Sequence, residues 1–185
     1  MKKFVAGVMV TLVCILGGAY AYFAGGFAPV ATASAPMPFE RKLAHMALNA
    51  KLQKEMPRTV PIEANEANYL AGAKEYLIHC AVCHGVPGKE KTAIARGEFP
   101  PPPVLLEGTG VTDDPPGETY WKVANGIRMT GMPSFNQSLS ETQMWQISLL
   151  LANADKLPHS VTAVLAGQPE SPQPTPAAEH PPARK

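Results

Sequence analysis

The pattern of apolar and polar positions begins with one long apolar run. From Phe4 to Phe27 the sequence is uncharged and strongly apolar. These 24 residues are enough for the ~20 that a helix needs to cross a bilayer, so we expect a transmembrane anchor in residues 1–28. A cleaved signal peptide is the alternative, because A-x-A sites occur at Ala19-Tyr20-Ala21 and Ala33-Ser34-Ala35.

The charges around the apolar run predict its orientation. Lys2 and Lys3 precede it, and no comparable basic pair follows directly. The positive-inside rule therefore places the N-terminus in the cytoplasm and the rest of the chain on the periplasmic side of a bacterial inner membrane. Cleavage would instead release a soluble periplasmic protein. Cys14, inside the run, is interpreted as a small apolar residue that faces lipid.

Residues 29–63 predict a linker that contains one short helix. The segment APVATASAPMP is built of small residues and prolines, which suits a chain leaving a membrane. An amphipathic helical pattern follows and stops before Pro57. Its apolar positions are Phe39, Leu43, Met46, Ala47 and Ala50. His45 in this helix is interpreted as a solvated or partly packed side chain.

Residues 64–154 carry three further helical patterns and no strand-like alternation. The first runs from Ala64 to Cys80 and keeps its apolar side chains on one face. The second covers 116–125, with Gly126 directly after its end. The third opens with the capping box Ser140-x-x-Gln143 and is mostly apolar from 144 to 152. These patterns predict an all-α domain of three to four helices.

Two segments lack a helical period. Residues 85–116 are rich in glycine and proline, and the run Pro100–Pro103 predicts a polyproline II stretch. Residues 155–185 are proline-rich and offer little apolar surface to bury, so we expect a disordered tail there.

Composition narrows the function. A chain of 185 residues leaves about one domain once the flanking segments are removed. Sixteen basic and fifteen acidic side chains give a net charge of +1, without any basic run, so we expect no nucleic-acid partner. Only three cysteines are present, and one of them is Cys14. A disulfide framework is therefore excluded.

The other two cysteines belong to the sequence CAVCH, made of Cys80, Cys83 and His84. C-x-x-C-H is the attachment signature of c-type haem, in which two thiols form thioethers with the vinyl groups and the histidine binds the iron. A thioredoxin-like dithiol would need a βαβ context, which the pattern lacks. A zinc site would need a second pair of ligands, and the other histidines are scattered. We expect one covalently bound haem c.

The second axial ligand of the iron decides what such a centre can do. Met132 is the candidate, because Gly131 allows a close approach of the backbone and Pro133 stiffens the loop. Met129 is the local rival. A filled sixth position favours electron transfer, whereas an open one would permit gas binding or peroxide chemistry. His79 is tethered beside Cys80 and can hardly reach the opposite face.

Residues 64 to about 154 resemble the class I monohaem c-type cytochromes, particularly small bacterial ones related to the cytochrome c subunits of terminal oxidases. The resemblance rests on CAVCH, on the segments Gly126-Ile127-Arg128 and Gly131-Met132-Pro133, and on the Trp145 helix. It implies a small haem domain in which Gly72 and Tyr76 cross the C-terminal helix at Trp145 and Leu149. It also implies that a carbonyl within Pro100–Pro103 accepts a hydrogen bond from His84. Trp121 and Arg128 are open candidates for haem contacts.

We therefore expect a membrane-tethered, periplasm-facing electron carrier with His84 and Met132 on the iron, and no catalytic residues. It would pass electrons between redox proteins that the sequence does not name. The alternatives are a haem enzyme or gas sensor with an open sixth site, and a fixed cytochrome subunit of an oxidase or dehydrogenase complex.

Overall fold

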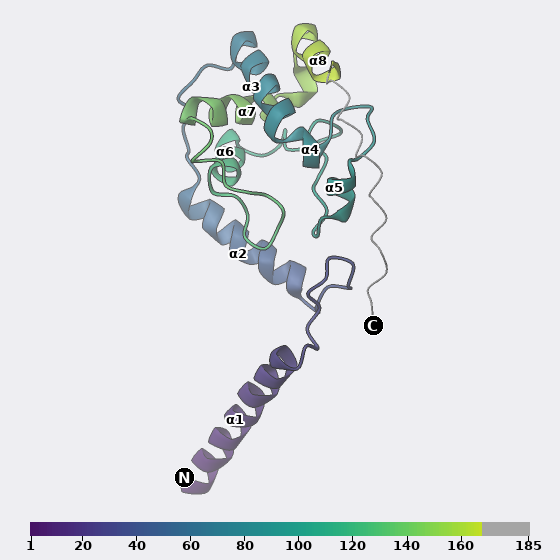
Figure 1. Ribbon diagram of the computed structural model, residues 1–185. Coiled ribbons are helices and arrows are strands. Elements are labelled where there is room, and N and C mark those ends of the chain that lie inside the picture. Colours follow the sequence, from purple (N-terminus) through teal and green to yellow (C-terminus); the bar gives the residue numbers. More distant parts are fainter. Residues whose placement is uncertain (168–185) are drawn as a thin grey trace, which may run out of the picture.

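The computed structural model describes residues 1–167, and every element in that part of the chain is helical (Figure 1). This confirms the all-α fold class. The elements in order are α1 (Lys2–Ala24), α2 (Glu40–Glu55), α3 (Glu66–His79), α4 (Ala81–His84), α5 (Ala93–Gly97), α6 (Pro116–Asn125), α7 (Glu141–Ala152), the 3-10 helix η1 (Ala154–Lys156) and α8 (His159–Ala166).

Helix α1 extends away from the rest of the molecule (Figure 1). None of its residues is buried, although the helix is strongly apolar. It is long and apolar enough to cross a membrane, a test that a signal sequence near an N-terminus also passes. The expected apolar helix is therefore present.

The core of the domain is the crossing of α3 and α7. At the crossing point Gly72 is so close to α7 that a Cβ atom there would lie 2.3 Å from the carbonyl oxygen of Gln146. The expected glycine-mediated crossing is confirmed, but Gly72 meets the backbone of Gln146 and Ile147 instead of Trp145. Trp145 stacks on Tyr120 of α6, with ring centroids 4.2 Å apart. The aromatic residue thus joins α7 to α6.

The start of α7 confirms the capping box. Ser140 accepts a hydrogen bond from the backbone N–H of Gln143, and the side chain of Gln143 accepts one from the backbone N–H of Ser140. The helix that follows is buried over most of its length. A buried helix needs its first N–H groups satisfied by such partners.

The prediction that residues 155–185 form a disordered tail is wrong for the first part of that segment. Helix α8 follows Pro158 and packs against α3, with Val161 fully buried and Leu165 almost so. That prediction gave weight to the prolines and overlooked the apolar i, i+4 pair Val161 and Leu165, which covers the end of the core. Residues 168–185 of the expected tail lie outside the described part of the chain.

Helix α2 forms as predicted, but its apolar stripe is not the face that packs. Leu52 and Met56 are buried against the domain, whereas Leu43 and Met46 are more than half exposed. The contact with α6 is tight, because Gly117 lies against the carbonyl of Pro57. The loop-like segment 85–116 also contains α5, a short helix capped by Thr92.

Candidate functional site

The CAVCH sequence lies at the junction of α3 and α4. Cys80 caps the end of α3 and is buried, while Cys83 and His84 lie on the single turn of α4 and are half-buried. All three cysteines of the chain are free thiols. Residues three apart on a helical turn lie on the same side, so the two sulfurs of Cys80 and Cys83 can serve one planar ligand.

His84 is oriented by the polyproline segment. Its Nδ1 lies 2.8 Å from the carbonyl oxygen of Pro103, and a carbonyl can only accept, so Nδ1 carries the proton. Nε2 has no hydrogen-bond partner among residues 1–167 and is left to bind a metal. Burial lowers the pKa of His84, while the Pro103 carbonyl and Glu98 act in the opposite direction. The ring is therefore favoured as the neutral imidazole that iron requires.

The two thiols of CAVCH are not activated. Burial raises the pKa of Cys80 to about 12, with Cys83 and Glu75 adding to the shift. Burial also raises the pKa of Cys83 to about 11, with a contribution from the Glu98 carboxylate 3.0 Å away. A redox dithiol needs a lowered pKa on its attacking thiol. These surroundings disfavour the thioredoxin-like alternative.

The zinc alternative also lacks support. Within residues 1–167, no group of three or more His, Cys, Asp or Glu side chains is placed to hold a metal ion. His45 is exposed on α2, and His79 pairs with Glu75 and lies edge-on to Phe135. His84 therefore has no second ligand pair of the kind that a structural zinc site requires.

Contacts made by three residues support this turn and were not predicted from the sequence. The buried Tyr76 hydroxyl donates to the carbonyl of Gly85, 2.7 Å away, and so fixes the end of α4. Thr92 donates to the carbonyl of Val82. Glu98 accepts a hydrogen bond from the Cys83 thiol, and its carboxylate occupies the space where a Cβ atom on Gly131 would lie, so it links the CAVCH turn to the Met132 loop. Each of these contacts spans nine residues or more, beyond the reach of a local sequence pattern.

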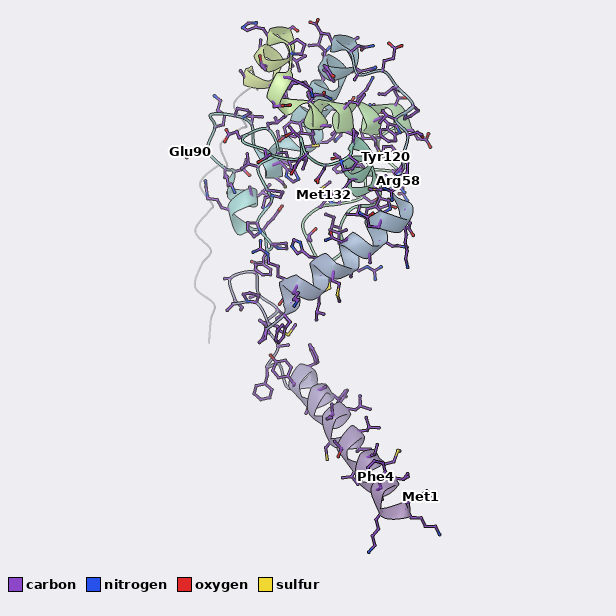
Figure 2. The ribbon with its side chains drawn as sticks, turned by 180° about the vertical axis from the view of Figure 1, so that it is seen from behind. Met1, Phe4, Arg58, Glu90, Tyr120 and Met132 are labelled. Carbon is purple, nitrogen blue, oxygen red and sulfur yellow. The ribbon has the colours of Figure 1, made fainter. Side chains whose placement is uncertain are left out.

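The two candidate methionines differ sharply in their surroundings. Met132 is half-buried and packs against the hydrophobic core (Figure 2). Its backbone is held on both sides, because its N–H donates to the Thr130 hydroxyl and its carbonyl accepts from the N–H of Ile127. Met129 is 90% exposed. Of the two side chains, only that of Met132 lies against the core.

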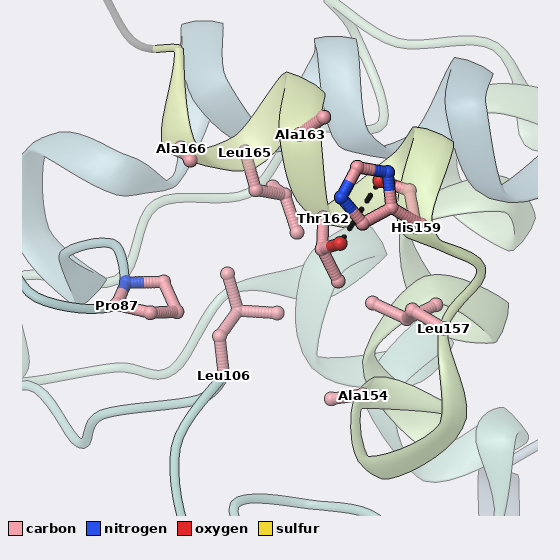
Figure 3. Close-up of a pocket in the computed structure, with 9 residues that line it drawn as sticks. All are labelled: Pro87, Leu106, Ala154, Leu157, His159, Thr162, Ala163, Leu165 and Ala166. Carbon is pink, nitrogen blue, oxygen red and sulfur yellow. Dashed lines mark hydrogen bonds between the residues drawn. The ribbon is translucent and has the colours of Figure 1, made fainter.

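Trp121 and Arg128 were the other candidates for haem contacts. The indole N–H of Trp121 donates to the carboxylate of Glu55, 3.3 Å away, and so links α6 to α2. Arg128 is exposed. A groove of about 390 Å³ lies elsewhere, between α8 and the loops that carry Pro87 and Leu106 (Figure 3). None of the CAVCH residues and neither methionine lines it.

Residues 67–149 match the family model described as "Cytochrome C oxidase, cbb3-type, subunit III". The matched segment contains the CAVCH turn, the Met132 loop and both crossing helices. This domain is a class I c-type cytochrome. Haem-based electron transfer is the chemistry of that family, and a single covalently bound haem c is its cofactor.

Other comparisons are more distant. No curated protein matches this cytochrome. A solved structure titled "Kuenenia stuttgartiensis reducing HAO-like protein complex Kustc0457/Kustc0458" matches with a TM-score of 0.44 and 26% identity. The match covers 51% of this chain and 46% of that chain, so the cytochrome spans about half the length of that relative.

The surface around CAVCH fits a haem. Large apolar side chains are exposed in and next to the motif and in the later segments that hydrogen-bond to it, which is costly unless something covers them. They are Ile78 at 69%, Val82 at 41%, Ile94 at 56%, Phe99 at 36% and Val104 at 39%. A porphyrin held through Cys80 and Cys83 would cover surface of this kind. The donor set, two neutral thiols and an imidazole with a free Nε2, suits the same group.

Proposed function

We propose that this cytochrome is an electron carrier tethered to the inner membrane by α1, with its haem domain in the periplasm. Cys80 and Cys83 hold the haem through thioethers, and His84 and Met132 are the axial ligands. The cofactor supplies one-electron Fe(III)/Fe(II) chemistry. Donor and acceptor are redox proteins, and the protein itself transforms no substrate.

The observation that supports this proposal best is that the structure prepares both proposed iron ligands, His84 and Met132. His84 presents Nε2 because Nδ1 is engaged by Pro103. Met132 is half-buried in a loop whose backbone is fixed, whereas Met129 is exposed. A thioether opposite an imidazole favours Fe(II) and raises the reduction potential. A filled sixth position leaves the iron little chemistry besides electron transfer.

A fixed subunit of an oxidase is the second candidate. It is favoured by the description of the matching family, which names a subunit of a terminal oxidase. In that case α1 would also serve assembly, and the electron acceptor would be another subunit. Gentle detergent extraction separates the two candidates, because a fixed subunit co-purifies with its partners and a mobile carrier does not.

Two measurements test the proposed function. The first is a redox titration of the haem-loaded protein with carbon monoxide added to the reduced form. One-electron behaviour without ready carbon monoxide binding is expected, and rapid binding would show an open sixth site. The second is alkaline carbonate extraction of membranes. The anchored protein stays with the lipid, whereas a protein cleaved at Ala21 or Ala35 is released.

A further inference from the structure

Helix α2 has two apolar faces, and the haem domain covers only one. Leu52 and Met56 are 2% and 6% exposed, and they pack against the domain. Leu43 precedes Leu52 by nine residues, which is two and a half helical turns at about 3.6 residues per turn. Leu43 therefore lies on the opposite side of α2, and it is 56% exposed.

The exposed side chains form a continuous stripe. Phe39, Leu43 and Met46 follow one another at intervals of four and three residues, and they are 73%, 56% and 60% exposed. We call these three residues the α2 stripe. Exposed apolar surface of this kind marks a binding site for another apolar partner.

The charges on α2 identify the kind of partner. Lys54 continues the stripe toward the C-terminal end of the helix, Lys42 lies on one flank, and Lys51, which pairs with Glu55, lies on the other. Glu40 in the first turn is the acidic residue beside the stripe. All three lysines are exposed. An apolar stripe edged by lysines is the arrangement of helices that lie in the headgroup region of a membrane and meet anionic lipids.

The position of α1 makes the same surface accessible to lipid. Residues 25–39 connect the two helices and reach at most about 50 Å when extended. In Figures 1 and 2, α2 runs crosswise to α1, with the haem domain on one side of α2 and α1 on the other. The α2 stripe is opposite the domain, so it faces the side from which α1 leaves.

We propose that α2 lies on the periplasmic surface of the membrane, with the α2 stripe inserted among the lipids and the lysines at anionic headgroups. The haem domain is thereby held at a fixed height and orientation above the bilayer. This inference extends the proposed tethering by α1, and it assigns membrane contact to a second segment of the chain.

The test compares two positions on neighbouring faces of α2. Met46→Cys lies in the stripe and Ala44→Cys does not, and both native residues are exposed. Each change is made in the haem-loaded full chain with Cys14→Ser, in nanodiscs that hold a single copy. The lipid is three parts phosphatidylcholine to one part phosphatidylglycerol. A charged, membrane-impermeant maleimide should label position 46 at least about tenfold more slowly than position 44. Equal rates would overturn the inference, as would protection that arises only in discs with two copies.

A second arm separates this inference from the fate of α1. The mass of the mature protein shows whether α1 is retained. If α1 is cleaved, the mature protein is floated with vesicles of the same lipid mixture, beside its Leu43→Glu/Met46→Glu variant. Flotation of the native protein alone supports membrane contact by α2. Absence of flotation by the native protein, or equal flotation of the two, overturns it. An unchanged haem spectrum confirms that the variant is folded.

Discussion

The Nδ1 atom of His84 lies 2.8 Å from the carbonyl oxygen of Pro103, nineteen residues later in the chain. This bond connects the turn that carries the thiols to the rigid proline segment. The proline ring restricts φ at Pro103, so this part of the backbone has less freedom than an ordinary loop. The imidazole is thereby fixed in one tautomer before any iron is bound.

The bond predicts a protected ring proton. In the reduced haem-loaded protein, the Nδ1–H of His84 should exchange slowly with solvent when followed by NMR. Pro103→Gly should accelerate this exchange, because glycine releases the backbone that aims the carbonyl. Pro101→Gly is the matched control at an exposed position of the same segment. Similar exchange in both variants would show that Pro103 has no special role.

Removing the proposed sixth ligand should change the haem spectrum. Met132→Ala should abolish the thioether-to-iron band of the oxidised form, lower the reduction potential and allow carbon monoxide to bind the reduced form. Met129→Ala should leave all three properties unchanged, because that side chain is 90% exposed. The assignment is wrong if only the Met129 change alters the sixth ligand.

Filling the helix crossing should destabilise the domain. Gly72→Ala places a Cβ atom 2.3 Å from the Gln146 carbonyl, so α3 and α7 must separate. Overpacking of this kind costs about 1–3 kcal/mol in the free energy of unfolding, measured with guanidinium chloride. Gly97→Ala meets open space and should change stability by less than about 1 kcal/mol. Equal effects of the two changes would rule out a close crossing at Gly72.

A similar change should detach α2 from the domain. In Gly117→Ala the added Cβ would lie 1.9 Å from the carbonyl oxygen of Pro57, directly after α2. The segment from Leu52 to Pro57 must move away, and the amide protons of α2 should exchange faster. Those of α7 serve as the internal control and should keep their protection. Unchanged exchange in α2 would mean that its packing does not depend on this contact.

Features encoded locally were predictable from the sequence. The capping box at Ser140 and Gln143 formed as expected, because both partners lie within one turn. The helix at 116–125 appears with the expected bounds, since Pro116 and Gly126 mark its ends. The carbonyl that orients His84 could be narrowed only to Pro100–Pro103, and the structure identifies it as Pro103.

Features that depend on distant contacts were missed. Helix α8 is stabilised by burying Val161 and Leu165 against α3, which the proline-rich composition of the C-terminal segment did not suggest. The sequence predicted helix α2 but not its packed face, because contact with α6 buries Leu52 and Met56 and leaves Leu43 and Met46 exposed. The contacts of Glu98 join segments far apart in the chain.

The covalent attachment of haem at Cys80 and Cys83 is the claim on which the rest depends. Its most direct test is the intact mass of the protein produced in a host that attaches haem c. We expect the mass of the polypeptide plus one haem for the native chain and for Cys14→Ser, and the mass of the polypeptide alone for Cys80→Ser/Cys83→Ser. A native protein without added mass, or a double variant that keeps the added mass, would contradict haem attachment at Cys80 and Cys83.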